Sequence, residues 1–269
     1  PKDLIYEEQQ TFTKFLEIKD PRKHPQVGKM VDEIRPLKDF DYIFMRKDPP
    51  VNVDYMNTLH ILSQAEFEGA NILNRPSALM KFNEKIFALQ FSDWMPDTSV
   101  ICKEDDFKLF KEKYSDVILK PLNGMGGDSI HKFDKTSEDH LKIFKELTNN
   151  YKTMVMVQNF LPEIYDGDYR ILIINGEPFP IGLARIPQKG SFKGNLAAGG
   201  RGEARELSAE QIQASKEIGK ILIQEGILFA GIDMIGSSLT EINITSPTGA
   251  REILTQTGQN PIKALLQSI

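Results

Sequence analysis

The sequence contains a single cysteine, Cys102, so neither an internal disulfide nor a multi-cysteine zinc site can form. Its four histidines, His24, His60, His131 and His140, do not follow the H-x-x-x-H spacing of helical metal sites, which argues against soft-metal chemistry. No run of 18 or more apolar residues occurs, and the first residues provide no secretory signal. We therefore expect no membrane partner and a cytoplasmic location.

The chain also lacks a strong excess of one charge. It has 33 Lys and Arg against 38 Asp and Glu, a formal net charge of −5. This balance argues against a nucleic-acid partner, so an anionic ligand would have to be met by local basic residues. With 40% hydrophobic and 26% charged residues, the 269-residue chain can build one large domain or two or three smaller lobes, and disorder is excluded as the main state.

Strand and helix patterns alternate along most of the chain, which is typical of an α/β fold. The first part is different: residues 2–36 are polar and aperiodic, and we interpret them as a surface loop or arm. The apolar run 41–45 then predicts a buried strand, and residues 77–91 predict one helix. Further on, Asn175-Gly176 lies between two apolar runs and predicts a hairpin with a type I′ turn.

Three glycines follow Lys120 in a predicted turn between two strands: Gly124, Gly126 and Gly127. Because glycine has no Cβ, the backbone amides of such a turn can approach phosphate oxygens closely. The segment lacks the G-K-[ST] ending of a Walker A loop and precedes a strand, so neither that loop nor the dinucleotide fingerprint fits. From this segment alone, a phosphate-binding turn and a mobile hairpin tip are equally good interpretations.

Two carboxylates and an amide lie on neighbouring predicted strands. Asp233 is within the apolar strand 228–235, and Glu241 and Asn243 share one face of the next strand because they are two residues apart. With 236–238 as a three-residue loop, Asp233 falls opposite Glu241, with their Cβ atoms roughly 5 Å apart. Paired carboxylates repel unless a cation lies between them, and oxygen ligands select Mg²⁺ or Mn²⁺. The alternative is a solvated sheet face.

Basic residues recur in otherwise uncharged segments. Arg170 and Arg185 lie inside the apolar strands of the predicted hairpin, where a charge requires a partner, and an anionic ligand is one candidate. Residues 186–203 are basic and rich in glycine. Loops of this length without structure are uncommon unless they are lids or disordered.

Together these features resemble the ATP-grasp superfamily, and five motifs resemble its bacterial-type glutathione synthetase family from about residue 36 onward. The motifs are Met45-Arg-Lys-Asp-Pro-Pro50, Asn83-Glu-Lys85, Ile118-Leu-Lys-Pro-Leu-Asn-Gly-Met-Gly-Gly127, Gly194-Asn-Leu-Ala-Ala-Gly-Gly-Arg-Gly202 and Leu239-Thr-Glu-Ile-Asn-Ile-Thr-Ser-Pro-Thr248. The resemblance implies an α/β (α+β) class and an ATP-grasp fold, in which nucleotide is held between two α/β lobes. An incomplete N-terminal α/β (pre-ATP-grasp) domain would precede it.

The resemblance also implies domain boundaries. Residues 1–82 would form a substrate-binding domain that lacks its first strand-helix-strand unit, so we interpret the chain as a fragment. Residues 83–269 would form the ATP-grasp domain. It would comprise a small nucleotide-binding lobe at 83–160 and a catalytic lobe at 161–269, with a lid at 186–202.

Residue roles follow from the same resemblance. The ATP-binding set is Lys85, Lys120, Gly124, Gly126, Gly127, Gln158, Asn159, Phe160, Leu161 and Asp168. The metal ligands are Asp233, Glu241 and Asn243, which would hold two Mg²⁺ or Mn²⁺ ions with ATP. The catalytic residues are Arg170, Arg185 and Gly200, the substrate-binding residues are Arg46, Ser246 and Thr248, and the lid residues are Lys193, Asn195 and Arg201.

The implied activity joins γ-glutamylcysteine and glycine at the expense of ATP, through an acyl phosphate, and gives glutathione, ADP and phosphate. The implied partners are these substrates and further copies of the chain in a homotetramer. Two alternatives stay open at this point. One is another ATP-grasp carboxylate-amine ligase, and the other is a nucleotide-binding module without ligase activity.

Overall fold

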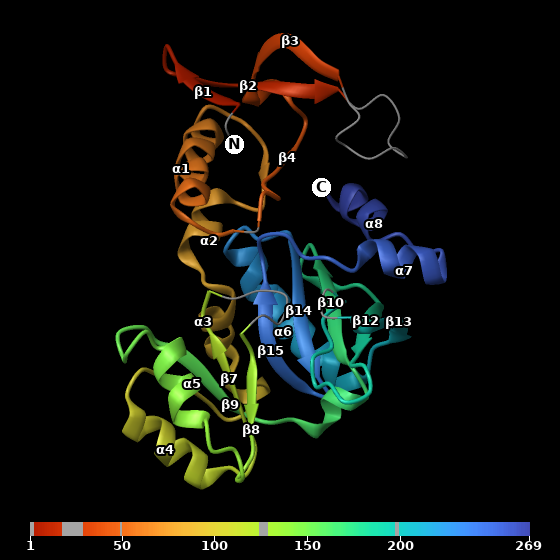
Figure 1. Cartoon of the computed structure of the whole chain (residues 1–269). Helices are drawn as coiled ribbons and strands as arrows, with labels where there is room; N and C mark the ends of the chain where they lie inside the picture. The colour runs from red at the N-terminus through yellow and green to blue at the C-terminus, as the bar shows by residue number, and fades with distance from the viewer. Residues whose placement is uncertain (1–2, 18–28, 49, 124–128, 197–198) are drawn as a thin grey trace. The chain divides into compact units, whose positions relative to one another are not determined.

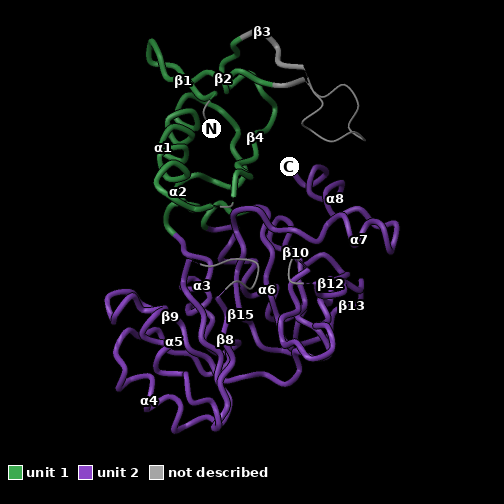
Figure 2. Tube along the Cα trace, viewed as in Figure 1, with its two compact units in different colours: residues 1–81, 225–227 green, residues 82–224, 228–269 purple. Residues whose placement is uncertain are grey.

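The computed structural model describes residues 3–17, 29–48, 50–123, 129–196 and 199–269. The chain divides into two compact units (Figure 2): residues 1–81 with 225–227, and residues 82–224 with 228–269. No helix within the described ranges is long and apolar enough to cross a membrane.

The first unit combines a small sheet with two helices. Strands β1 (Leu4–Glu7), β2 (Gln10–Glu17) and β3 (Lys29–Pro36) form an antiparallel sheet in that order. Strands β4 (Ile43–Phe44) and β5 (Ile72–Leu73) form a short parallel pair. The longer helix is α1 (Val53–Phe67), with α2 (Pro76–Lys81) after β5, and the two helices pack together.

The interpretation of residues 2–36 as an arm without structure was wrong. Residues 10–15 are rich in threonine and phenylalanine, which favour the extended backbone. The strand is also tied to a distant part of the same unit, since the Glu68 carboxylate accepts hydrogen bonds from the Thr11 amide at 2.7 Å and its hydroxyl at 3.0 Å. The part of this interpretation that concerned residues 18–28 lies outside the described residues.

The predicted helix at 77–91 is interrupted. Helix α2 ends at Lys81, and Asn83 begins a new helix, α3 (Glu84–Ala88), followed by the 3₁₀ segment Leu89–Trp94. The Asn83 side chain accepts hydrogen bonds from the amides of Lys85 and Ile86, as a helix N-cap does. The interruption places Glu84 and Lys85 in the first turn of a helix in the second unit.

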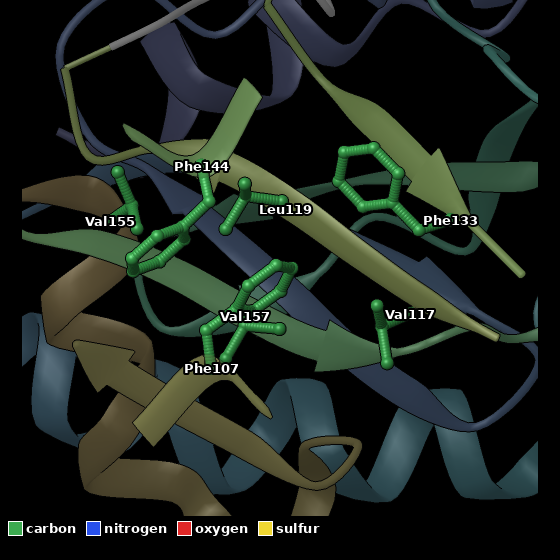
Figure 3. Packing of buried hydrophobic residues seen from close by; sticks show 7 residues of the cluster. All are labelled: Phe107, Val117, Leu119, Phe133, Phe144, Val155 and Val157. Carbon is green, nitrogen blue, oxygen red and sulfur yellow. The ribbon is translucent and has the colours of Figure 1, made fainter. Parts of the chain in front are cut away.

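The second unit contains two antiparallel sheets (Figure 1). The first has the order β6 (Thr98–Ile101), β9 (Val155–Asn159), β7 (Val117–Pro121) and β8 (His131–Phe133). Helices α4 (Glu104–Lys113) and α5 (His140–Leu147) contribute to its core, where the rings of Phe107 and Phe144 stack at 4.5 Å (Figure 3). Apolar packing therefore fixes the strands that carry Lys120 and Gln158.

The second sheet has the order β13 (Arg201–Glu206), β12 (Ile181–Ile186), β10 (Asp168–Ile174), β14 (Phe229–Ile235) and β15 (Ser238–Asn243), and β11 (Glu177–Pro178) also pairs with β10. Helices α6 (Ala209–Gln224), α7 (Ala250–Thr257) and α8 (Pro261–Ser268) complete this part. Asn175 and Gly176 both have positive φ, 47° and 82°, which confirms the predicted type I′ turn.

Candidate active site

The second unit contains a pocket whose lining comes from both sheets. Its apolar lining residues are Ile118, Ile130, Phe160, Leu161, Ile164, Phe192 and Ile235. Its charged and polar lining residues are Lys85, Lys120, Gln158, Asn159, Asp168, Lys193, Asn195, Asp233, Thr240 and Glu241. Apolar surface combined with a few convergent polar groups is typical of a cofactor or ligand site.

The acidic pair lies in this pocket. Asp233 on β14 is the register partner of Glu241 on β15, as predicted, and Gly231 is the partner of Asn243. The Asn243 amide nitrogen lies 3.4 Å from Asp233 Oδ2. The alternative of a solvated sheet face does not fit Asp233, because only 4% of this residue is exposed.

The predicted three-residue loop before β15 was wrong in detail. Ile235 pairs with Ser238, so the loop has two residues, Gly236 and Ser237. Gly236 has a positive φ of 59°, as the first loop residue of a type II′ turn does. A β-bulge next to Asp233 restores the predicted register, because one extra residue, Thr240, is inserted between the partners of Met234 and Asp233.

Protein cations compensate the carboxylates of the pocket. Arg170 lies opposite Asp233 in the β10–β14 ladder and binds both of its carboxylate oxygens, at 2.5 and 3.0 Å. Arg185, the register partner of Asp168, bridges Asp168 Oδ2 at 2.5 Å and Asp233 Oδ2 at 2.9 Å. The two arginines predicted to need partners inside the sheet thus find them in the protein itself.

Both predicted phosphate-binding lysines are buried, with 5% exposure for Lys85 and 6% for Lys120. Lys85 Nζ lies 3.0 Å from Glu241 Oε1, and Lys120 Nζ donates to the carbonyl oxygen of Thr240 at 3.1 Å. A buried ammonium is costly unless it is paired, so a lysine in this setting is poised for an anionic ligand.

Burial and charge shift the pKa values of the polar cluster. Burial lowers the pKa of Lys120 to about 8, although the nearby Glu241 opposes the shift. Burial raises the pKa of Asp168, and the Arg185 charge offsets only part of this effect. For Asp233 burial also acts to raise the pKa, but the charges of Arg170 and Arg185 outweigh it and hold the pKa well below its usual range. Asp233 therefore stays ionised.

Glu84 was not among the predicted site residues. Its Oε1 accepts hydrogen bonds from the Ile244 amide at 2.8 Å, the Thr245 amide at 3.2 Å and the Thr245 hydroxyl at 3.0 Å. Glu84 and Lys85 therefore fasten the first turn of α3 to the end of β15. The signal was present in the sequence, since Glu84 belongs to the Asn83-Glu-Lys85 motif, but nothing local indicates its partners.

Other predicted residues lie outside the lining of this pocket. Thr248 contacts the cluster through its carbonyl, 3.5 Å from Arg170 Nη1, and Ser246 precedes it on the same segment. The Arg201 side chain is 73% exposed and pairs with Glu203 at 2.7 Å. Arg46 belongs to the first unit. The three glycines predicted to bind ATP, Gly124, Gly126 and Gly127, lie outside the described residues.

Residues 197–198 of the predicted lid lie outside the described residues, and hydrogen bonds join the described parts of the lid on either side of them. The Gly200 amide donates to the Asn195 carbonyl at 3.1 Å, and the Gln188 side chain donates to the Gly199 carbonyl at 2.7 Å. The approach is close enough that a Cβ on Gly200 would lie 2.0 Å from the Gly194 carbonyl oxygen. Glycine is therefore required at Gly200 for this conformation, which brings Lys193 and Asn195 to the pocket.

The residues present fit a divalent cation bound with an anionic ligand. Asp233, Glu241 and Asn243 supply carboxylate and amide oxygens from adjacent strands, the hard donors that Mg²⁺ and Mn²⁺ prefer. In addition, Asp168 Oδ1 is buried in the pocket without a hydrogen-bond partner among the described residues. A buried acceptor of this kind calls for a ligand donor or an ion.

Family models match nearly the whole chain. The model described as prokaryotic glutathione synthetase, ATP-grasp domain, matches residues 84–258, and the corresponding N-terminal domain matches residues 1–80. A glutathione synthetase of Escherichia coli strain K12 is 49% identical over 219 residues, which cover 81% of this chain and 69% of the relative.

Solved structures show the same fold at low sequence identity. A peptide-associated ATP-grasp ligase of Chryseobacterium gregarium has a TM-score of 0.64 and 17% identity, with 99% of this chain and 84% of that chain covered. D-alanyl-alanine synthetase A of Vibrio cholerae has a TM-score of 0.60 and 14% identity, with 98% and 85% covered. The fold is therefore ATP-grasp.

Proposed function

The chain belongs to the prokaryotic glutathione synthetase family and is an ATP-dependent ligase that forms glutathione, and we propose how its residues divide the work of that reaction. The cysteinyl carboxylate of γ-glutamylcysteine attacks the γ-phosphate of ATP, which gives an acyl phosphate and ADP. The amine of glycine then attacks the acyl carbon and displaces phosphate. The observation that carries the assignment of the site is the Asp233–Glu241 pair, which faces two buried lysines in one pocket.

The phosphate end of the nucleotide is assigned to Lys85 and Lys120. Their ammonium groups are buried beside Glu241 and the Thr240 carbonyl, so they can neutralise a triphosphate without first being ordered. Bound Mg²⁺ or Mn²⁺, held by Asp233, Glu241 and Asn243, would supply further neutralisation of phosphate charge. The chemistry of phosphoryl transfer needs positioning and charge neutralisation rather than a protein nucleophile.

The base and sugar of ATP are assigned to the apolar lining and to residues 158–161. The side-chain amide of Gln158 donates to Thr98 Oγ1 at 2.9 Å, which ties this side chain to β6. The backbone amides of Asn159 and Phe160 donate to the carbonyls of Asp97 and Asp116 at 3.2 and 3.0 Å, so we assign adenine to the remaining backbone groups of the segment. Asp168 Oδ1, which lacks a protein partner among the described residues, is suited to accept a ribose hydroxyl.

The dipeptide and the developing oxyanion are assigned to Arg170, Arg185 and Gly200, with Arg46, Ser246 and Thr248 around the dipeptide. Guanidinium groups stabilise oxyanions without losing their own charge. Residues 186–202 would act as the lid, because an acyl phosphate hydrolyses readily in water and must be shielded until glycine attacks. The lid residues Lys193 and Asn195 already line the pocket.

The same family membership leads us to propose the domain division at residues 82 and 83, a homotetrameric assembly and a cytoplasmic location. Analytical ultracentrifugation tests the assembly, since a tetramer and a monomer differ fourfold in mass.

Phosphate release in the presence of ATP and Mg²⁺ tests the activity against both alternatives. Release that requires γ-glutamylcysteine, with glutathione formed only when glycine is added, supports the proposal. Release that depends on another carboxylate and amine pair would identify a different ATP-grasp ligase. Absence of release with every pair, in a protein that still binds ADP, would identify a nucleotide-binding module.

A further inference from the structure

Thr240 is an extra residue in an otherwise regular ladder. Along β15 and just beyond it, Leu239, Ile242 and Ile244 are fully buried, whereas Glu241 and Asn243 are partly exposed. If Thr240 is left out of the count, these five residues alternate strictly between buried and partly exposed positions, as a strand with one buried face should. Neither the two-residue turn nor the pairing of Asp233 with Glu241 requires the additional residue.

The two polar groups of Thr240 are both engaged within the site. Its hydroxyl donates to the carbonyl oxygen of Asp233 at 3.1 Å, and its own carbonyl oxygen accepts from Lys120 Nζ at 3.1 Å. Thr240 also lines the pocket. The bulge therefore links the backbone of β14 at Asp233 to a lysine on the other sheet of the unit.

β15 is the edge strand of its sheet and, among the described strands, pairs only with β14, so each residue of a regular β15 would direct its backbone groups either into that ladder or away from the sheet. Thr240 is left out of the ladder by the bulge, and its carbonyl accepts a hydrogen bond from Lys120 Nζ. An ammonium group has three donors, so one bond to this carbonyl fixes its position and leaves two donors for phosphate.

We propose that Thr240 is a positioning residue for nucleotide phosphate: its carbonyl holds the Lys120 ammonium beside the Asp233–Glu241 pair, and its hydroxyl locks the bulge that presents this carbonyl. The inference rests on the proposed function, because it takes the pocket to bind ATP. It assigns a role to a residue that touches no reacting atom.

Deletion of Thr240 separates this role from a purely structural one. The deletion variant retains a two-residue turn and a regular ladder with Asp233 opposite Glu241, so we expect it to fold with a melting temperature close to that of the parent protein. ADP affinity in the presence of excess Mg²⁺, measured by titration calorimetry, should fall about tenfold, since a hydrogen bond to a charged group is lost. Unchanged ADP affinity in the folded variant would overturn the proposal.

A double-mutant cycle shows whether the effect passes through Lys120. In a Lys120→Met background, deletion of Thr240 should weaken ADP binding little further, because the group that Thr240 positions is already absent. Additive losses would contradict the proposal. If the parent protein binds ADP but forms no glutathione, this result would count against the proposed function and leave the role of Thr240 intact.

Point substitutions keep the test decisive if the deletion variant does not fold. Thr240→Val preserves shape and removes the hydroxyl, whereas Thr240→Ser keeps the hydroxyl. We expect a drop in ADP affinity and a rise in the KM for ATP of roughly threefold to fivefold for valine and little change for serine, with the KM for glycine unaffected in both. Equal behaviour of the two variants, or a change confined to glycine, would refute the role assigned to the hydroxyl.

Discussion

Arg170 and Asp233 face each other across the β10–β14 ladder, and the guanidinium binds both oxygens of the carboxylate. Only 6% of Arg170 and 4% of Asp233 is exposed. Because Arg185 also contacts Asp233, the charge of this carboxylate is compensated before any ligand arrives. Two arginines on neighbouring strands therefore hold the acidic residue of the site in place, and such preorganisation favours catalysis.

Removal of Arg170 should destabilise the protein as well as impair the reaction. Arg170→Ala leaves a buried carboxylate with one partner fewer, so we expect a loss of about 3 kcal/mol in the free energy of unfolding, measured in urea. Arg170→Lys should recover only part of the loss, since an ammonium cannot bind two oxygens in the planar fork of a guanidinium.

Arg201→Ala is the matched control for Arg170→Ala. The Arg201 side chain is 73% exposed and its partner Glu203 is partly exposed, so the change should cost much less than Arg170→Ala. If Arg170→Ala lowers the free energy of unfolding as little as Arg201→Ala does, the Arg170–Asp233 pair is not a significant source of stability.

The two carboxylates of the proposed metal site should respond differently to neutralisation. The Glu241 side chain is 22% exposed, and among the residues that the structure describes its ion-pair partner is Lys85. Glu241→Gln should therefore raise the Mg²⁺ concentration for half-maximal activity about tenfold or more. It should also lower the free energy of unfolding, because the buried Lys85 loses its charged partner, but by less than Asp233→Asn, since Asp233 is the partner of two arginines.

Asp233→Asn should affect both quantities, because it also removes the charge that Arg170 and Arg185 neutralise. Magnesium titrations of initial rate, paired with urea unfolding of the same preparations, separate the two variants. An unchanged magnesium requirement in Glu241→Gln would remove Glu241 from the metal site.

Local patterns were sufficient to predict the centre of the site. Asp233, Glu241 and Asn243 could be placed together because strand alternation and hairpin register are short-range properties, and the Asn175-Gly176 turn is encoded by its own two residues. The bulge could not be derived in this way, since a three-residue loop gives the same Asp233–Glu241 pairing. The skipped step between the buried residues Leu239 and Ile242 was the available sign.

Interactions between distant segments were not predictable from the sequence. The strand around Thr11 is stabilised by Glu68, 57 residues away, and Glu84 binds the backbone of Ile244 from 160 residues away. The end of the predicted helix at 77–91 had a local cause, the Asn83 cap, but asparagine also occurs within helices and its capping role becomes clear only from the geometry.

Substitutions in the segment between β12 and β13 should uncouple ATP consumption from ligation. Lys193 lines the pocket, and a Cβ on Gly200 would clash with the Gly194 backbone, so Lys193→Ala and Gly200→Ala should both disturb closure. We expect phosphate release to exceed glutathione formation severalfold in each, because an exposed acyl phosphate is hydrolysed. Arg201→Ala, which changes an exposed side chain, should have a smaller effect; strict one-to-one coupling in Gly200→Ala would contradict the lid assignment.

Lys120 should make nucleotide binding dependent on pH. Burial lowers its pKa from 10.5 to about 8, so between these values the unfolded chain binds a proton that the folded protein does not. The contribution of this lysine to folding stability therefore rises with pH across that window, as the cost of burying its charge disappears. The affinity for nucleotide has the opposite dependence on pH, because phosphate requires the ammonium form, and ADP affinity should fall as the pH rises above about 8.

Proton uptake on ADP binding tests this prediction. At about pH 9, binding should take up on the order of one proton, which calorimetry in buffers of different ionisation enthalpy measures directly, and near pH 6.5 the uptake should vanish. Lys120→Arg keeps a cation that does not titrate in this range, so uptake that persists at about pH 9 in this variant would assign the proton to another group.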